Sequence, residues 1–154
     1  MTLLNTFDED VYLTCINLEH VKLDEIEFVN TRFEFSNLEN ASFQSTYLEN
    51  CCFAYANLTN ANFQEAILKK SDFKLAIIHN TDFGDAFLEE VDLKDVDLSG
   101  ALNLSLKQVL EADNWQYAKY ESKLQAEVNK YKEELKVKTQ DKIYLDKFYH
   151  EHRN

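Results

Sequence analysis

The fold of this chain is decided by residues 41–68, which read ASFQSTYLENCCFAYANLTNANFQEAIL. A Phe or Leu returns at every fifth position of that stretch, and the same spacing of Leu, Phe or Ile continues without exception from Leu13 to Leu98. A helix returns a side chain to one face about every 3.6 residues and a strand about every 2, so a period of five requires a unit that turns a corner each time. Fixed self-similarity of this kind predicts a solenoid.

Two positions of each five-residue unit are suited to the interior. One is the bulky central residue, and the other lies two places earlier and is small or β-branched, as at Ala41, Thr46 and Cys51. The other three positions carry most of the Asp, Glu, Asn and Lys. We therefore expect the bulky residue to fill the core and the compact one to let the backbone close around it.

Residues 56–60 (ANLTN) and 61–65 (ANFQE) resemble the A(D/N)LXX units of the pentapeptide-repeat family, and the resemblance covers residues 11–100. It implies a right-handed, four-sided β-helix. The order of central residues supports four sides independently, because a twenty-residue coil stacks Phe on Phe whereas a fifteen-residue coil stacks Phe on Leu. The expected core columns are Phe33, Phe53 and Phe73; Phe43, Phe63 and Phe83; Leu38, Leu58 and Ile78; and Leu48, Leu68 and Leu88.

The expected fold class is an all-β solenoid with an α-helical C-terminal extension, the solenoid being a right-handed quadrilateral β-helix of about four and a half coils. Three parts are expected: an N-terminal cap at residues 1–10, the β-helix at 11–100, and a C-terminal helical cap with an amphipathic tail at 101–154. Caps are needed because each end of a stacked ladder is an open strand edge that invites pairing with other chains.

Beyond Gly100 the five-residue pattern stops. Ser105, with Gln108 three residues later, is a capping-box signature and predicts a short helix over about 106–112. A second helix is expected from near Trp115, N-capped by Asp113 or Asn114, with its aromatic residues over the open C-terminal coil. Residues 105–120 also resemble the helical ending that follows pentapeptide tracts in many cyanobacterial proteins, with Lys107 and Gln108 at positions that are usually Glu and Gln.

Residues 120–152 are rich in Lys and Glu and carry an apolar stripe. The stripe is Leu124, Val128, Tyr131 and Leu135. It is lost at Lys138 and Lys142 and resumes, shifted, at Ile143, Leu145 and Phe148, which predicts one long helix broken or kinked near 139–141. We expect this helix to fold back on its own protein, and a homodimer through a short coiled coil is the alternative.

The charge is divided unevenly along the chain. Residues 1–100 contain 19 Asp and Glu against 6 Lys and Arg, whereas residues 101–154 contain 9 against 10. An acidic solenoid repels nucleic acid, phosphorylated ligands and anionic membranes and favours basic partners, although the same charge also serves solubility. No apolar run approaches a membrane span, the acidic start lacks the features of a secretory signal, and three cysteines fit no disulfide framework, so we expect a cytoplasmic protein.

No catalytic constellation is found in the sequence. The four histidines are scattered, and there are only two glycines, neither of them in a phosphate-cradling loop. His150 and His152 suit a frayed terminus better than a metal site. We therefore expect a chain that is not an enzyme and that uses no cofactor or metal.

Two columns of apolar residues fall on outward positions of a twenty-residue coil. The Phe35 column, two residues after the centre, is Phe35, Tyr55 and Leu75, with Ile77 beside its top and Cys15 below it. The Tyr47 column, one residue before the centre, is Tyr47, Ile67 and Phe87, and we expect it on the diagonally opposite edge. Such strips mark binding sites, but they can also stabilise the ladder by stacking or be covered by the tail. Asn40, Asn60 and Asn80 form a third column, read as a structural amide ladder.

The leading functional hypothesis is a non-enzymatic protein-binding, regulatory or adaptor module that uses one of these columns or the tail. Its partner is another protein, with basic and DNA-binding proteins among the candidates, and not nucleic acid itself or a membrane. The family resemblance implies an alternative, a DNA mimic that inhibits or protects a type II topoisomerase such as gyrase. A third hypothesis is a structural or self-associating element.

Overall fold

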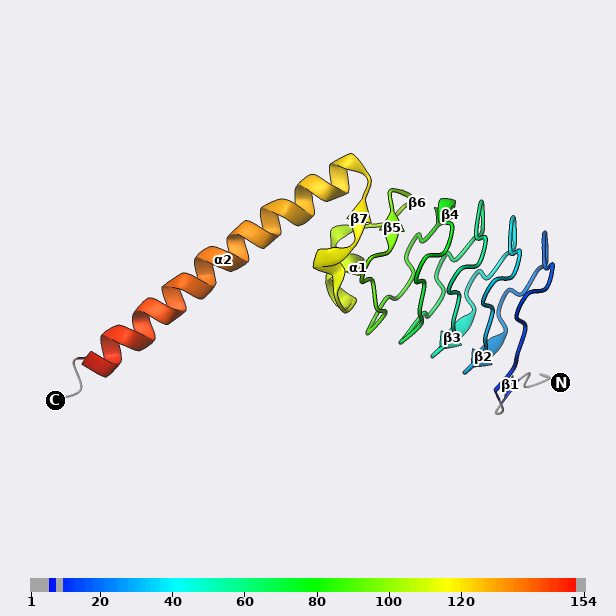
Figure 1. The fold of residues 1–154 in the computed structure, drawn as a ribbon, viewed down its shortest axis with the longest axis horizontal. Helices are drawn as coiled ribbons and strands as arrows, with labels where there is room; N and C mark the ends of the chain where they lie inside the picture. The colour runs from blue at the N-terminus through cyan, green and yellow to red at the C-terminus, as the bar shows by residue number, and fades with distance from the viewer. Residues whose placement is uncertain (1–5, 8–9, 152–154) are drawn as a thin grey trace.

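The computed structural model describes residues 6–7 and 10–151. Figure 1 shows a stack of coils that begins near the N-terminus and ends in a helical region, from which one long helix runs away. In chain order the elements are β1 (Thr6–Phe7), β2 (Glu27–Val29), β3 (Tyr47–Glu49), β4 (His79–Asp82), β5 (Asp97–Leu98), β6 (Gly100–Leu102), α1 (Leu106–Glu111), the 3-10 helix η1 (Trp115–Tyr117), β7 (Lys119–Tyr120) and α2 (Ser122–Glu151).

Successive coils pair in parallel with a shift of twenty residues. Arg32 bridges Tyr12 on one side and Cys52 on the other, and β2 pairs with β3 through Phe28 and Leu48. A shift of twenty residues corresponds to four pentapeptides per coil, the register expected from the order of central Phe and Leu residues. Each unit is too short for a long strand, so most of the ladder consists of single bridges joined by turns.

The core is a stack of like residues. All twelve central residues from Phe33 to Leu88 are buried. The rings of Phe33 and Phe53 are stacked with centroids 4.9 Å apart, and those of Phe43 and Phe63 with centroids 4.8 Å apart. Rings of the two Phe columns meet edge to face, as Phe43 and Phe53 do at 5.7 Å. Both arrangements are favourable for aromatic pairs, so the two Phe columns pack against each other in the interior.

The compact inward position has a second role that its size alone does not indicate. At four of the five Ser or Thr residues in this position, the hydroxyl donates to the central carbonyl of the preceding coil: Ser36 to Leu13 at 2.5 Å, Thr46 to Leu23 at 2.8 Å, Ser71 to Leu48 at 2.7 Å and Thr81 to Leu58 at 2.7 Å. The fifth, Thr31, donates to Val29 at 3.4 Å. A buried hydroxyl needs such a partner. For these four residues the preceding coil supplies one.

Each pentapeptide turns its corner at the residue two places after the centre. All seventeen residues at this position from Cys15 to Asp95 have φ between 53° and 61°. Many of the corners close with a hydrogen bond from the next compact residue to the centre, such as Ala41 N–H to the Leu38 carbonyl at 3.0 Å. A positive φ at the third residue of such a turn is the type II geometry, which favours Gly or Asn.

The ladder pairing extends past residue 100, and the C-terminal end of the stack is covered. Strand β6 pairs with β4, with a register shift between His79 and Asp82, and β7 pairs with β5. Helix α1 begins at Ser105 with the predicted capping box. The Gln108 side chain also donates to the carbonyls of Phe83 and Ala86, at 2.8 and 2.9 Å, which occupies acceptors that the last coil would leave free.

The predicted second helix from near Trp115 is wrong. Residues 115–117 form only the 3-10 turn η1, because Lys119 and Tyr120 are drawn into strand pairing with β5, and α2 begins at Ser122. Trp115 is only partly buried, and Tyr117 is exposed. The buried side chains over the last coil are instead mostly aliphatic: Val109, Ala112, Ala118, Tyr120, Leu124 and Val128.

Helix α2 is continuous, so the predicted break near residues 139–141 is wrong. Losing an apolar stripe removes tertiary contacts but no backbone hydrogen bond, and this stretch has no Pro or Gly to interrupt the helix. Among the α2 side chains that the structure describes, Leu124 and Val128 near its start are buried, whereas Leu135 is exposed. The helix does not fold back along the coils, and Figure 1 shows it running away from them.

The N-terminal end contrasts with the C-terminal end. Strand β1 pairs with Glu27 and Phe28 of β2. The rest of the expected cap at residues 1–10 lies outside the described residues, apart from Asp10. The central residues of the first coil, Leu13, Leu18 and Leu23, are only partly buried.

Candidate interaction surface

The Phe35 column lies on the corners of three successive coils and is open to solvent. The exposed fractions of Phe35, Tyr55 and Leu75 are 60%, 47% and 53%. The two rings are stacked with centroids 4.8 Å apart and an interplanar angle of 7°. Because nearly parallel rings cover each other's faces, a partner reaches their edges rather than a free aromatic face. This geometry suits an apolar protein segment better than a stacked base or sugar ring.

These corners are unusual places for large apolar residues. A left-handed conformation costs an ordinary L-residue about 1–2 kcal/mol, and Asn tolerates it better than most residues. Five of the seventeen corners from Cys15 to Asp95 are Asn, and the others are mostly charged or small. Phe35, Tyr55 and Leu75 are the three large apolar residues of this set, and they lie in one column. Backbone strain combined with solvent exposure of apolar surface is a feature of functional sites.

An apolar shoulder continues the column toward the C-terminal end. Ile77 is exposed on the coil of Leu75, two residues further along the chain. It lines a shallow hollow with Ala101 and the exposed Leu102, and the hollow is bordered by Asp97 and Glu121. The hollow forms where the β4–β6 register shift displaces the backbone, and the five-residue pattern contains no signal for it.

The acidic border of this hollow is charged at neutral pH. Hydrogen bonds from Lys119 and from Ser99 lower the pKa of Asp97 to about 2. Glu121 accepts from the N–H groups of Lys123 and Leu124, which lowers the pKa of its carboxyl group. Asp97 is ion-paired with Lys119 at 2.8 Å, so Glu121 supplies the negative charge beside the apolar column, an arrangement that favours a basic partner segment with apolar side chains.

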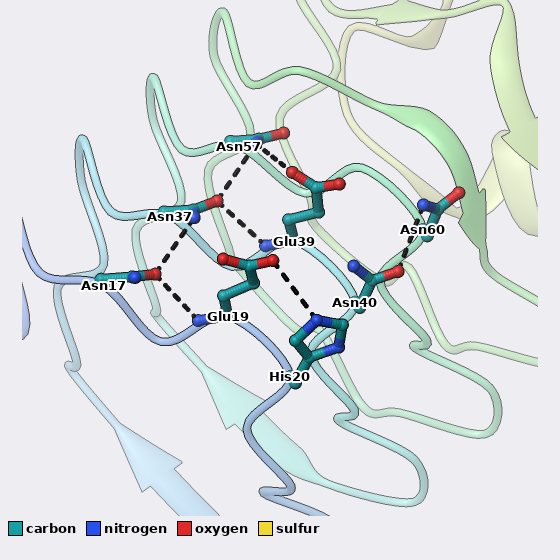
Figure 2. A network of polar contacts seen from close by, with 8 residues as sticks. All are labelled: Asn17, Glu19, His20, Asn37, Glu39, Asn40, Asn57 and Asn60. Atoms are coloured by element: carbon teal, nitrogen blue, oxygen red, sulfur yellow. Dashed lines mark hydrogen bonds and ion pairs between the residues drawn. The ribbon is translucent and has the colours of Figure 1, made fainter.

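Amide ladders lie on the same side of the Phe35 column as Ile77, which bridges Asn57 directly. Figure 2 shows Asn17, Asn37 and Asn57 in one row, joined by bonds of 3.0 and 3.1 Å, with Asn40 and Asn60 in a second row joined at 3.2 Å. Asn80 extends the second row at 3.3 Å. Each amide serves as donor to one coil and acceptor for the next, so these rows hold the coils in register.

The Tyr47 column is differently built. Tyr47, Ile67 and Phe87 bridge one another through the backbone one residue before the centre, where φ is not positive. Ile67 and Phe87 are 37% and 56% exposed, but Tyr47 is half-buried, and its hydroxyl donates to Glu49 at 2.5 Å, which raises the pKa of Tyr47. Large and β-branched residues are ordinary at such extended positions, so this column has no conformational cost to explain.

Helix α2 covers neither column, because it leaves the C-terminal end and runs away from the coils. The hypothesis that the tail hides one column is therefore wrong for the part of the chain that the structure describes. The structure does not bring the two columns together into one site. Of the wider surface, Ile77 was predicted from the sequence, whereas Leu102 and the two carboxylates of the hollow were not.

The three cysteines are free. Burial raises the pKa of Cys51 to about 12 and that of Cys52 to about 11, so neither thiol forms an appreciable thiolate at neutral pH. Cys15 is exposed below Phe35. Within residues 6–7 and 10–151, no group of His, Cys, Asp and Glu could hold a metal ion. None of the helices described is long and apolar enough to cross a membrane.

The chain is similar to a pentapeptide repeat protein, Rfr23, from the cyanobacterium Cyanothece 51142, at 21% identity over 73% of this chain and 86% of that one, with a TM-score of 0.40. It is also similar to HetL, a pentapeptide repeat protein involved in heterocyst differentiation regulation in Nostoc sp. strain PCC 7120, at 23% identity over 66% of this chain and 44% of that one, with a TM-score of 0.35.

A third likeness is to QnrB1, a plasmid-mediated fluoroquinolone resistance protein, at 16% identity over 73% of this chain and 80% of that one, with a TM-score of 0.32. At these scores the likenesses carry no argument about function. No curated protein matches the sequence closely enough to count as a relative. A family profile described as pentapeptide repeats matches eight copies, over residues 12–50 and 41–80. With its five-residue period, twenty-residue pairing and stacked central Phe and Leu residues, the chain belongs to the pentapeptide-repeat family.

Proposed function

We propose that this chain is a non-enzymatic protein-binding module and that its docking surface is the Phe35 column together with Ile77. One observation carries the proposal. The three large apolar residues among seventeen left-handed corners lie one above another and remain exposed. Folding alone does not require this arrangement, because Asn occupies equivalent corners at 40, 60 and 80 and forms a ladder there. A binding role accounts for both the strain and the exposure.

The proposal includes a rigid support for that surface. We take the coil to be right-handed and four-sided, with about four and a half coils, a height of roughly 22 Å at the strand spacing of about 4.8 Å. Side chains at equivalent corners then repeat at the ladder spacing, as Phe35 and Tyr55 do at 4.8 Å. A partner segment presenting apolar side chains about 5–6 Å apart, as one face of a helix does, matches this spacing more closely than a strand.

The partner proposed is a protein segment that combines apolar and basic side chains, and the proposed location is the cytoplasm. Its apolar groups would contact the ring edges of Phe35 and Tyr55, and a Lys or Arg would extend its stem over Leu102 toward Glu121. The excess of Asp and Glu in residues 1–100 adds long-range attraction for such a segment.

The test is a pull-down from native cytosol with matched variants. In the first, Phe35→Asn, Tyr55→Asn and Leu75→Asn copy the amide column at residues 40, 60 and 80, and in the second, Tyr47→Thr, Ile67→Thr and Phe87→Thr remove the other column. A partner that binds the native chain and the second variant, but is weakened about tenfold or more by the first, supports the proposal. Equal retention of that partner by the first variant contradicts it.

A topoisomerase-directed role would rest on the acidic surface instead of the column. The two hypotheses separate because the Asn substitutions leave every charge in place. An effect of the native chain on gyrase supercoiling that survives in the Phe35→Asn, Tyr55→Asn, Leu75→Asn variant would favour charge mimicry over docking at the column.

A further inference from the structure

The first coil has an open edge with a specific hydrogen-bonding pattern. In the coils above it, the residue before each centre directs both backbone groups to the preceding coil: Arg32 N–H donates to Val11, and its carbonyl accepts from Leu13, each at 2.8 Å. Asn37 and Ser42 do the same. The equivalent residues of the first coil are Tyr12, Asn17 and Lys22, whose backbone N–H and C=O groups have no partner among residues 6–7 and 10–151.

The floor inside this edge is apolar. Leu13, Leu18 and Leu23 are partly buried, whereas the residues stacked directly above them, Phe33, Leu38 and Phe43, are fully buried. Ile16 is also exposed here. Unpaired strand groups around an apolar floor favour association with a further layer of chain.

The C-terminal end of a second copy cannot supply that layer. Continuing the parallel ladder would require unpaired backbone N–H and C=O groups on the outer edge of that copy's last coil. In this chain those groups are used: Val91 accepts from Asp113 at 2.8 Å, Val96 accepts from Lys119 at 3.0 Å, and Gln108 occupies the carbonyls of Phe83 and Ala86. The outer edge of this coil is therefore covered by strand β7 and by helix α1 of the same chain, and not by a further complete coil on which a second copy could stack.

The hydrogen-bonding groups on the edge of the first coil are complementary to those on the same edge of a second copy. A residue that offers its N–H and its C=O on the same side is half of the hydrogen-bonded pair of an antiparallel ladder, in which two residues exchange both bonds. Two first coils that face each other across a two-fold axis run antiparallel on every side. Each of Tyr12, Asn17 and Lys22 can then use both of its groups.

We infer that two copies of this chain associate head to head through their first coils. The solenoid rises along its axis as the chain goes round, and this rise decides which sides of the two first coils pair. Along the axis, β1 and the segments around Tyr12, Asn17 and Lys22 each lie roughly 1.2 Å further on than the side before, a quarter of the strand spacing of about 4.8 Å. The distance between the two facing coils is equal on all four sides only if a side far along the axis faces one that is less far along. Tyr12 therefore pairs with Asn17 of the second copy, and Lys22 pairs with β1 of the second copy.

This association closes at two copies. The interface is isologous, and the covered C-terminal ends point outward, so no fibre can grow.

The charge of the first coil predicts the salt dependence of the dimer. Residues 10–27 contain five Asp and Glu against one Lys, so the two edges repel each other at low ionic strength. Salt shortens the screening length to about 8 Å at 0.15 M and strengthens the dimer, whereas it weakens binding of a basic partner at the Phe35 column.

Sedimentation equilibrium of the full chain tests the inference. We expect a monomer–dimer equilibrium that shifts toward dimer as salt is raised from 20 to 300 mM, with no larger species. Asn17→Ala is the matched control, because it also loses the Asn17 side-chain bonds to Asn37 and Glu19. Asn17→Pro additionally removes a backbone N–H that has no partner among the described residues of one copy; relative to Asn17→Ala it should weaken the dimer about tenfold while leaving the melting temperature of the monomer nearly unchanged. A chain that stays monomeric at all concentrations, or a dimer indifferent to Asn17→Pro but lost with Leu135→Glu in α2, would overturn it.

A mixing experiment tests the pairing itself. On a Cys15→Ser background, chains carrying Tyr12→Cys are mixed with chains carrying Asn17→Cys and oxidised mildly. Antiparallel partners lie about 5.5 Å apart at their Cα atoms, within the range that a disulfide spans. We expect covalent dimers in the mixture at a rate at least about tenfold above either chain alone. Equal rates in all three samples would contradict the proposed two-fold arrangement.

Discussion

The chain contains two aromatic stacks with the same spacing and opposite surroundings. Phe33, Phe53 and Phe73 stack inside the coils, fully buried at positions without a positive φ, and Phe35 and Tyr55 stack outside them, about half exposed at left-handed corners. The centroid distances, 4.9 and 4.8 Å, are nearly equal. The inner stack removes apolar surface from water at no conformational cost. The outer stack leaves apolar surface exposed to water, and its residues have a strained backbone conformation. Stability of the fold therefore does not account for the outer stack.

The largest expected effect comes from breaking the inner stack. Phe53→Ala removes a fully buried ring that lies between Phe33 and Phe73, and it leaves a cavity that rigid coils cannot close. The free energy of unfolding should fall by about 3–5 kcal/mol, measured by denaturant unfolding followed by circular dichroism. A fall below about 1 kcal/mol would mean that the columns do not carry the stability of the fold.

A smaller effect is expected from building an aromatic at another corner. Asn60→Tyr places a large residue at φ 57° and removes the amide bonds to Asn40 and Asn80, so we expect a loss of about 1–2 kcal/mol. Ile67→Tyr is the control, because position 67 is one residue before a centre, pairs in the ladder and has no side-chain hydrogen bond to lose. An equal loss at both positions in chemical denaturation would argue against a conformational cost at the corners.

The smallest of the three effects concerns the compact inward position. Thr81→Val keeps the shape of the side chain but leaves the buried Leu58 carbonyl without the Thr81 hydroxyl, and should cost about 1 kcal/mol. Thr81→Ser retains the hydroxyl and should recover most of that loss. If the Ser variant unfolds as easily as the Val variant, the hydroxyl contributes nothing and the methyl group matters.

The period of five residues predicted much of this structure because it is a constraint repeated many times. Each central Phe or Leu has the same neighbours above and below, so one register satisfies all of them. The start of α1 was also readable, since the capping box between Ser105 and Gln108 is local.

The features that sequence reasoning missed depend on contacts between distant residues. Lys119 and Tyr120 form a strand because β5 offers an open edge, and no local pattern signals this. The hollow beside Ile77 arises from a register shift between β4 and β6, and the continuity of α2 reflects backbone bonds that the loss of an apolar stripe leaves intact. The left-handed conformation of the corners could not be predicted from residue type, because few of the corner residues are Asn and none is Gly.

The most direct test of the account is the unfolding free energy of the Phe35→Asn, Tyr55→Asn, Leu75→Asn variant. If the outer stack exists for binding, the variant should be as stable as the native chain or more stable by about 1 kcal/mol, because Asn suits a left-handed corner and can form an amide ladder there. A loss of more than about 2 kcal/mol would show that the outer stack supports the fold as the inner one does, and would contradict the claim.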